Sequence, residues 1–101
     1  TLSSATLNIA IIAEAKGEFE TAIKYYQKVI RINPYVKESY VNLSYLFYRL
    51  NNPEKSIEVN KKAIQYNSSW HEPFENIARV YYEMKDTVNA NYYYSEAQKR
   101  K

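Results

Sequence analysis

The sequence contains no cysteine, a single glycine, three prolines and one histidine among its 101 residues. The absence of cysteine excludes disulfides and thiolate zinc sites, and a lone histidine argues against a histidine-based metal centre. With so little glycine and proline there is little sequence for long loops, so helix is expected over most of the chain. The longest apolar run, Ile9 to Ala13, is far too short to cross a membrane, so we expect no membrane insertion.

The charge of the chain is mildly basic, with a net charge of +3 and a pI near 9.0. Positive and negative residues are interspersed, whereas nucleic-acid binding usually requires a concentrated basic patch. The composition therefore gives little support to a nucleic-acid partner, and it indicates no cofactor. No feature of the sequence marks a compartment, and a cytoplasmic location is the default expectation.

The chain repeats itself every 34 residues. The aligned positions fall into columns of like size: Ile9, Leu43 and Ile77; Ala10, Ser44 and Ala78; Ala22, Ser56 and Ala90; Val29, Ala63 and Ala97. Small residues align with small ones and large apolar residues with large ones, and no gap is needed. A period of this length is typical of repeat architectures.

Each repeat contains two helical patterns. In the second repeat Tyr40, Leu43, Phe47 and Leu50 recur at three- and four-residue spacing, which places them on one face of a helix. The segment "NNPEK" then interrupts the pattern before a second helix begins. The same reading of all three repeats predicts six helices, at about 3–15, 19–32, 37–50, 53–66, 70–84 and 87–100.

Several residues are candidates for starting or ending these helices. Asn52 and Asp86 are predicted to cap the second helices of their repeats, and Ser69 with Glu72 has the spacing of a capping box. Gly17 is predicted to end the first helix, where a positive φ is useful. The glycine therefore indicates a turn between helices, with no phosphate-binding loop around it.

These features resemble the tetratricopeptide repeat (TPR) family. The residues that carry the resemblance are Leu43-Ser44, Phe47, Ser56 and Ala63 with their counterparts, together with Gly17, Phe19 and Pro34. The departures are Asn60 in place of an aromatic residue, Ser68 in place of proline, and Asn51 and Lys85 in place of the turn glycine. The resemblance implies an all-α fold, an α-α superhelix of three helix-turn-helix repeats at about 3–36, 37–70 and 71–101, forming a single domain over residues 1–101.

The two ends of the array differ in character. In the last helix Asn91, Gln98 and Arg100 replace apolar residues of the earlier repeats, which predicts a polar outer face and an end of the array. The first helix is apolar on more than one side. Its apolar residues are Leu2, Leu7, Ile9, Ile11 and Ile12. This surplus predicts contact with an upstream repeat, a partner or a second copy of the chain.

The resemblance also implies that the first helix of each repeat lines a concave groove. In these helices one column is invariant within the chain, namely Asn8, Asn42 and Asn76. An amide both donates and accepts hydrogen bonds, so a ladder of amides suits an extended peptide of any sequence. The alternative is that these asparagines bond locally between helices.

The hydrogen bonds of the three asparagines alone are too weak for stable binding, so neighbouring groove positions would have to supply the remaining affinity. They are Leu7, Ile11, Tyr45, Tyr48, Arg49, Arg79 and Tyr82. Tyrosine and arginine are frequent anchors of interfaces. Four acidic residues at the rim, Glu38, Glu72, Glu75 and Glu83, favour a basic peptide. The leading hypothesis is therefore a non-enzymatic scaffold or adaptor module, part of a larger protein, that binds a peptide segment of a partner.

Other functions have less support in the sequence. His71 is expected in a turn between repeats, and no paired-acid arrangement stands out among the carboxylates, which argues against an enzyme. Self-association through the apolar first helix is the main alternative, and single-stranded RNA binding by the groove tyrosines and arginines is a lesser one. Members of the family that bind Hsp70 or Hsp90 tails use a carboxylate clamp, of which only Asn42 matches here, because Leu7, Ile11 and Glu72 stand at the other clamp positions. The sequence therefore argues against such a tail as the partner.

Overall fold

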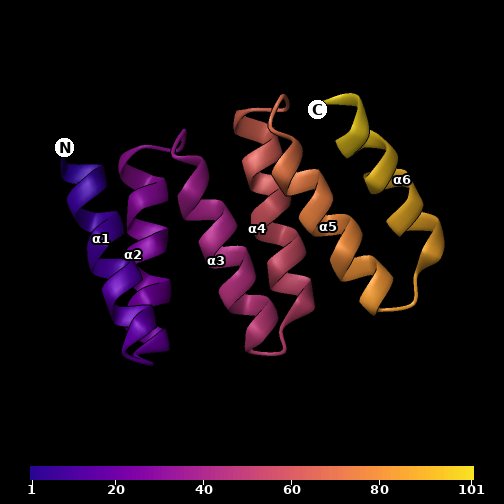
Figure 1. Cartoon of the computed structure of the whole chain (residues 1–101). Coiled ribbons are helices and arrows are strands. Elements are labelled where there is room, and N and C mark those ends of the chain that lie inside the picture. Colours follow the sequence, from indigo (N-terminus) through magenta and orange to yellow (C-terminus); the bar gives the residue numbers. More distant parts are fainter.

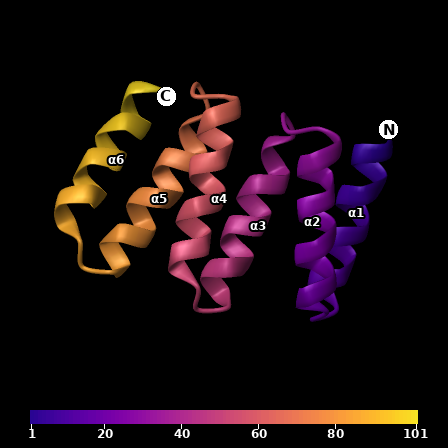
Figure 2. The same cartoon turned by 180° about the vertical axis from the view of Figure 1, so that it is seen from behind.

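The computed structural model describes residues 1–101 and contains six α-helices and no strand. The helices are α1 (Leu2–Ala15), α2 (Phe19–Ile32), α3 (Lys37–Arg49), α4 (Pro53–Tyr66), α5 (His71–Glu83) and α6 (Thr87–Lys99). Figure 1 and the reverse view in Figure 2 show them side by side in sequence order, with the two termini at opposite ends of the row. The predicted array of three helix pairs is confirmed. No helix is both long and apolar enough to span a membrane.

The turn inside each repeat has the same backbone conformation in all three copies. Gly17, Asn51 and Lys85 have φ values of 79°, 61° and 63°. In the first turn the N–H of Gly17 donates to the carbonyl of Glu14 at 3.0 Å, and the next N–H donates to the carbonyl of Ala13 at 2.9 Å. Equivalent bonds close the other two turns. This pattern is a Schellman motif, in which a residue with positive φ ends the helix. The lone glycine therefore ends the first helix, as predicted.

The second helices of repeats two and three begin at capping side chains. Oδ1 of Asn52 accepts a hydrogen bond from the N–H of Lys55 at 3.3 Å, and Oδ1 of Asp86 accepts one from the N–H of Asn89 at 3.2 Å. Pro53 occupies the first turn of α4, where its missing N–H has no cost. Both predicted caps are confirmed.

The predicted capping box at Ser69 and Glu72 is wrong. Helix α5 begins at His71, and its N-cap residue Trp70 makes no side-chain hydrogen bond to the helix. Ser69 instead donates both its N–H and its hydroxyl to Oδ1 of Asn67. Asn67 therefore holds the serine in the turn before the helix, where it cannot act as a cap.

The turn between repeats depends on this asparagine. In the preceding junction Oδ1 of Asn33 accepts a hydrogen bond from the N–H of Tyr35 at 3.1 Å, which matches the bond from Ser69 to Asn67. The two asparagines also have similar backbone angles, with φ near −150°. The asparagine thus preserves the turn in the second junction, where Ser68 replaces Pro34.

The small-residue columns lie where the two helices of a repeat approach each other. All six residues of the two columns, Ala10, Ser44, Ala78, Ala22, Ser56 and Ala90, are at most 8% exposed. In the second repeat the hydroxyl oxygens of Ser44 and Ser56 are 2.9 Å apart. A larger side chain at either position would push α3 and α4 apart, which explains the size restriction seen in the sequence.

The hydrophobic core is distributed unevenly along the array. One cluster of 12 buried residues joins the first two repeats, and a second cluster contains only Ile57, Ile77 and Val80. Aromatic contacts supplement this smaller cluster. The ring of Tyr93 stacks on Tyr81 with a centroid separation of 5.8 Å. The cluster that reaches the third repeat is therefore much smaller than the one that joins the first two.

Candidate peptide-binding groove

Three neighbouring hollows cover the surface formed by α3, α5 and the adjoining parts of α4 and α6. The hollow between α3 and α5 has a volume of about 200 Å³, and hollows of about 300 and 500 Å³ adjoin it. Arg79 lines the first and second hollows, and Tyr48 and Val80 line the first and third. Because they share walls, we treat the three hollows as one surface, called the groove below.

Most of the predicted binding residues line this groove. Those that do are Asn42, Tyr45, Tyr48, Arg49, Asn76, Arg79 and Tyr82. The three predicted residues of α1 do not line it. Asn8 is exposed and Ile11 is 38% exposed, whereas Leu7 is 8% exposed and belongs to the main core cluster. The prediction for Leu7 is therefore corrected, because its side chain packs inside the protein and offers almost no surface to a ligand.

The asparagines of the ladder have polar neighbours within the chain. Burial raises the pKa of the Tyr26 phenol, the hydrogen bond to Glu14 adds to the increase, and the amide of Asn42 acts in the opposite direction. Oδ1 of Asn76 lies 3.5 Å from Nη1 of Arg79, at the limit of a hydrogen bond. Both amides remain partly exposed, so each can still contact a ligand.

The hollow between α3 and α5 lies where the second repeat departs from the first. Tyr26, 1% exposed, fills the space between the helices of the first repeat, and the residue 34 positions later is Asn60. Nδ2 of Asn60 donates to the hydroxyl of Ser44 and to the carbonyl of Ser56, while its Oδ1 is buried without a partner. Ser44 and Ser56 line the hollow. We attribute the hollow to this shorter side chain.

Arg49 lines the groove and also contacts residues of the first repeat. Its Nη1 lies 3.0 Å from Oε2 of Glu14 on α1. Its guanidinium also lies 5.6 Å from the ring centroid of Phe19 and 5.8 Å from that of Tyr45. These contacts use the charge and the planar faces of the guanidinium within the chain, so Arg79 is the more available of the two groove arginines.

The acidic rim is weaker than the sequence indicated. Glu72 pairs with Lys37, and Glu75 lies 3.0 Å from Nζ of Lys101 and 3.8 Å from Nδ1 of His71. Burial alone would raise the pKa of Glu72, but the hydrogen bond from Lys37 and the nearby positive charges lower it overall. Only Glu38 and Glu83 of the four rim carboxylates have no basic partner, so the rim gives less support to a basic peptide than expected.

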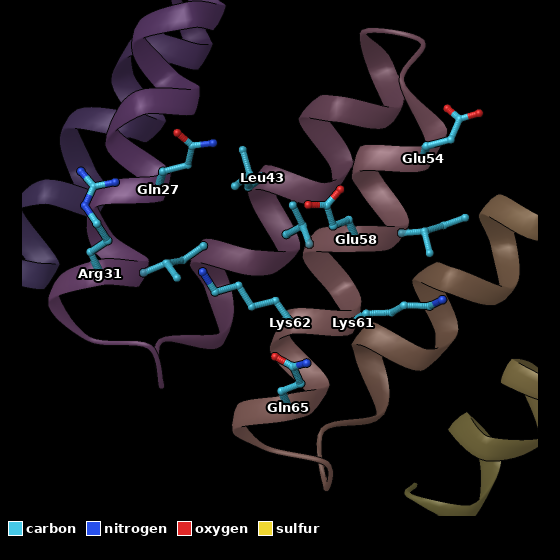
Figure 3. Close-up of a pocket in the computed structure, with 11 residues that line it drawn as sticks. Gln27, Arg31, Leu43, Glu54, Glu58, Lys61, Lys62 and Gln65 are labelled. Atoms are coloured by element: carbon cyan, nitrogen blue, oxygen red, sulfur yellow. The ribbon is translucent and has the colours of Figure 1, made fainter.

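The largest hollow lies elsewhere, between the second helices α2 and α4, and its volume is about 670 Å³. Figure 3 shows Leu43 in the gap and Lys62 reaching from α4 toward α2. Charged residues of both signs surround it: Arg31, Glu54, Glu58, Lys61 and Lys62. None of the residues predicted from the sequence to bind a ligand lines this hollow. The only available signal was the run of polar residues at helical spacing on α4, which is also typical of an ordinary solvated face.

Comparison with known proteins gives two matches to tetratricopeptide repeat family models, at residues 4–35 and 37–69. The chain is also 28% identical over 81 residues to protein O-mannosyl-transferase TMTC3 of Mus musculus. That alignment covers 79% of this chain but only 9% of the relative.

Solved structures with the same fold include MamA and the first TPR of Spaghetti (RPAP3) bound to the HSP90 peptide SRMEEVD. One MamA structure superimposes with a TM-score of 0.87 at 19% identity, covering 97% of this chain and 57% of MamA. The RPAP3 structure superimposes with a TM-score of 0.84 at 15% identity, covering 98% of this chain and 79% of the other. The helix pairs, the 34-residue period and the two family matches lead to one conclusion: the chain belongs to the tetratricopeptide repeat family.

Proposed function

We propose that this chain is a non-enzymatic interaction module that binds an extended peptide segment of a partner protein in the groove. The observation that supports this most directly is the hollow between α3 and α5, which is lined by Asn42 and Asn76 together with the hydroxyls of Ser44 and Ser56. Membership of a family of interaction modules is consistent with a scaffold or adaptor role. We further propose that residues 1–101 act as one domain.

The amides alone do not provide enough binding energy. A hydrogen bond contributes a net of about 0.5–1.5 kcal/mol, and micromolar affinity requires about 8 kcal/mol. Tyr45 and Tyr82 are 53% and 64% exposed at the groove, so they can cover apolar parts of a ligand. Burial of two tyrosine rings, together with the hydrogen bonds of the asparagine amides, would be enough for micromolar affinity.

The charges suggest a peptide of mixed character. Arg79 is positive and lies between two hollows, and Glu83 is negative in the third. A ligand with one acidic residue near Arg79 and no large net charge would complement this arrangement. The basic preference expected from the sequence has less support, because two of the four rim carboxylates already have partners.

A test begins with panning a random peptide display library against the 101-residue protein, followed by calorimetry on the recovered peptides. In the Asn42→Ala/Asn76→Ala variant we expect the affinity to fall by about 10- to 100-fold, because two hydrogen bonds are lost. Asn8→Ala is the matched control and should bind normally, since Asn8 lies outside the groove. Equal affinity of the double variant and the unmodified protein for every recovered peptide would rule out the groove as the binding site.

Two further ligands separate the alternatives. The peptide SRMEEVD, which is bound in the RPAP3 structure, is expected not to bind, since Leu7, Ile11 and Glu72 replace clamp positions. Single-stranded RNA at low salt is expected to show no change in electrophoretic mobility when the protein is added, because the groove charges have both signs. Tight, salt-sensitive RNA binding that Arg79→Ala abolishes would replace the peptide proposal.

A further inference from the structure

The outward side of α1 carries an apolar stripe with no partner in the protein. It consists of Leu2, Ala5, Ile9 and Ile12, called the N-terminal stripe below, and their spacing of three and four residues places them along one side of the helix. Leu2, Ile9 and Ile12 are 67%, 46% and 54% exposed. The other residues of the apolar surplus, Leu7 and Ile11, lie away from this stripe. The stripe is therefore a defined surface and not a general apolar excess.

The same positions are covered in the other two repeats. The equivalents of the stripe are Val36, Ser39, Leu43 and Leu46 in α3 and its N-cap, and Trp70, Pro73, Ile77 and Val80 in α5 and its N-cap. In each set the last three residues are buried, with exposures of at most 4%, and the first is partly buried against the core. The covering partners come from the preceding repeat, since α3 contacts α2 and α5 contacts α4. The N-terminal stripe thus lacks only the element that covers its equivalents.

We propose that the N-terminal stripe docks a further helical hairpin of the same repeat type, joined to Thr1 within the same polypeptide. The second helix of this hairpin would present aliphatic side chains like those of Ile23 and Ile30 in α2, which belong to the first junction. The existing junctions also indicate how long the connection between the added hairpin and α1 would be. Helix α2 ends at Ile32 and α3 begins at Lys37, so a docked hairpin would end about as close to α1 as α2 does to α3. This surface is separate from the groove and does not depend on what the groove binds.

A second copy of the chain fits the stripe less well. In a head-to-tail stack the stripe would meet α6, where Asn91 and Gln98 replace Ile23 and Ile30 and are exposed. A two-fold contact between stripes would involve four residues of one helix, whereas a stable dimer uses about 20–30 residues on each side. A hairpin in the same polypeptide avoids most of the entropy lost when two molecules associate, so a small apolar surface suffices for it.

The experiment adds a copy of residues 1–34 directly before Thr1, which keeps the 34-residue period and places a second α2 ahead of α1. Amide exchange in the original α1 should slow by about tenfold or more relative to the 101-residue protein, because covering one aliphatic side chain already accounts for that factor. Ile9→Glu in the original α1 should abolish the protection, and Ile9→Ala should remove part of it. Ile11→Glu, on another side of α1, is the matched control and should leave the protection in place.

Three outcomes would overturn the proposal. The first is an unchanged exchange rate in the lengthened protein, and the second is an equal effect of Ile9→Glu on exchange in the original and lengthened proteins. The third is a dimer of the 101-residue protein in light scattering that Ile9→Glu converts to monomer, which would assign the stripe to a second copy. A monomer in both cases, together with slowed exchange in the lengthened protein, is the expected result.

Discussion

The hydroxyl of Tyr26 on α2 donates a hydrogen bond of 2.6 Å to Oε1 of Glu14 on α1. The other carboxylate oxygen of Glu14 pairs with Arg49 of α3, so one carboxylate joins three helices. We expect Tyr26→Phe to lower the free energy of unfolding by about 1–3 kcal/mol, because a buried bond to a charged acceptor is lost. Urea unfolding measures the loss. Tyr92→Phe, at an exposed tyrosine, should change stability little, and equal effects of the two variants would contradict the importance of this bond.

Alkaline pH should unfold the protein through its buried tyrosines. Burial raises the pKa of Tyr40 from 10.0 to about 12, and burial with the Glu14 bond raises that of Tyr26 further. A raised folded pKa contributes stability below the unfolded value, and this stability is lost as pH rises from 10 toward 12. Tyrosinate absorbance and circular dichroism followed together should show the last tyrosines ionising only as helix is lost. Ionisation of all twelve tyrosines near pH 10 in a folded protein would contradict this.

Relief of backbone strain at Lys85 should stabilise the protein. Lys85 has a φ of 63°, a conformation that costs most residues energy but not glycine. Lys85→Gly should raise the free energy of unfolding by about 0.5–1 kcal/mol, after the greater chain entropy of glycine is included. Lys16→Gly is the matched control, since Lys16 has a φ of −84° and should lose stability. Chemical denaturation of both variants checks the opposite signs.

The converse change at Gly17 should destabilise the protein by about 1 kcal/mol. A Cβ at this position would meet no atom within 4 Å, so the cost of Gly17→Ala comes from φ alone. Gly17→Asn should cost less, because asparagine tolerates this conformation and occupies the equivalent Asn51. An alanine variant as stable as the original, measured by the same denaturation, would show that the turn tolerates another conformation.

Acid should weaken the junction between the second and third repeats. The pKa of Glu72 is lower than 4.5 in the folded protein, because the effect of Lys37 and the nearby charges exceeds that of burial. A lowered folded pKa contributes stability above the unfolded value, and this part is lost as pH falls below about 4.5. Glu72→Gln should remove this part of the pH dependence, measured as unfolding free energy between neutral and acid pH. Glu58→Gln, at an exposed glutamate without a basic partner, is the control.

The sequence supported detailed predictions wherever the fold depends on local or repeated features. The 34-residue columns, the positive φ at Gly17 and the caps at Asn52 and Asp86 each follow from one residue type with a specific backbone or packing role. The capping box failed because Asn67, two residues before Ser69, bonds to the same serine. A spacing rule considers two positions and does not include such a competitor.

The site was less predictable because it depends on how much of each side chain the packing covers. Leu7 and Ile11 both belong to the apolar first helix, yet one is in the core and the other is at the surface. The sequence identified Asn60 as a departure from an aromatic column, but the hollow and the unpaired oxygen of Asn60 become evident only in the three-dimensional arrangement. Likewise, the pairing of Glu72 with Lys37 joins residues 35 positions apart.

The uneven core has a consequence for how binding and folding are linked. Only two residues of the third repeat, Ile77 and Val80, belong to a buried apolar cluster, so this repeat is the part of the array expected to open first. A ligand lodged between α3 and α5 bridges the strongly and weakly held parts of the molecule. Part of its binding free energy would then be used to order α5 and α6, which lowers the observed affinity. Binding of a partner peptide would in turn stabilise the third repeat.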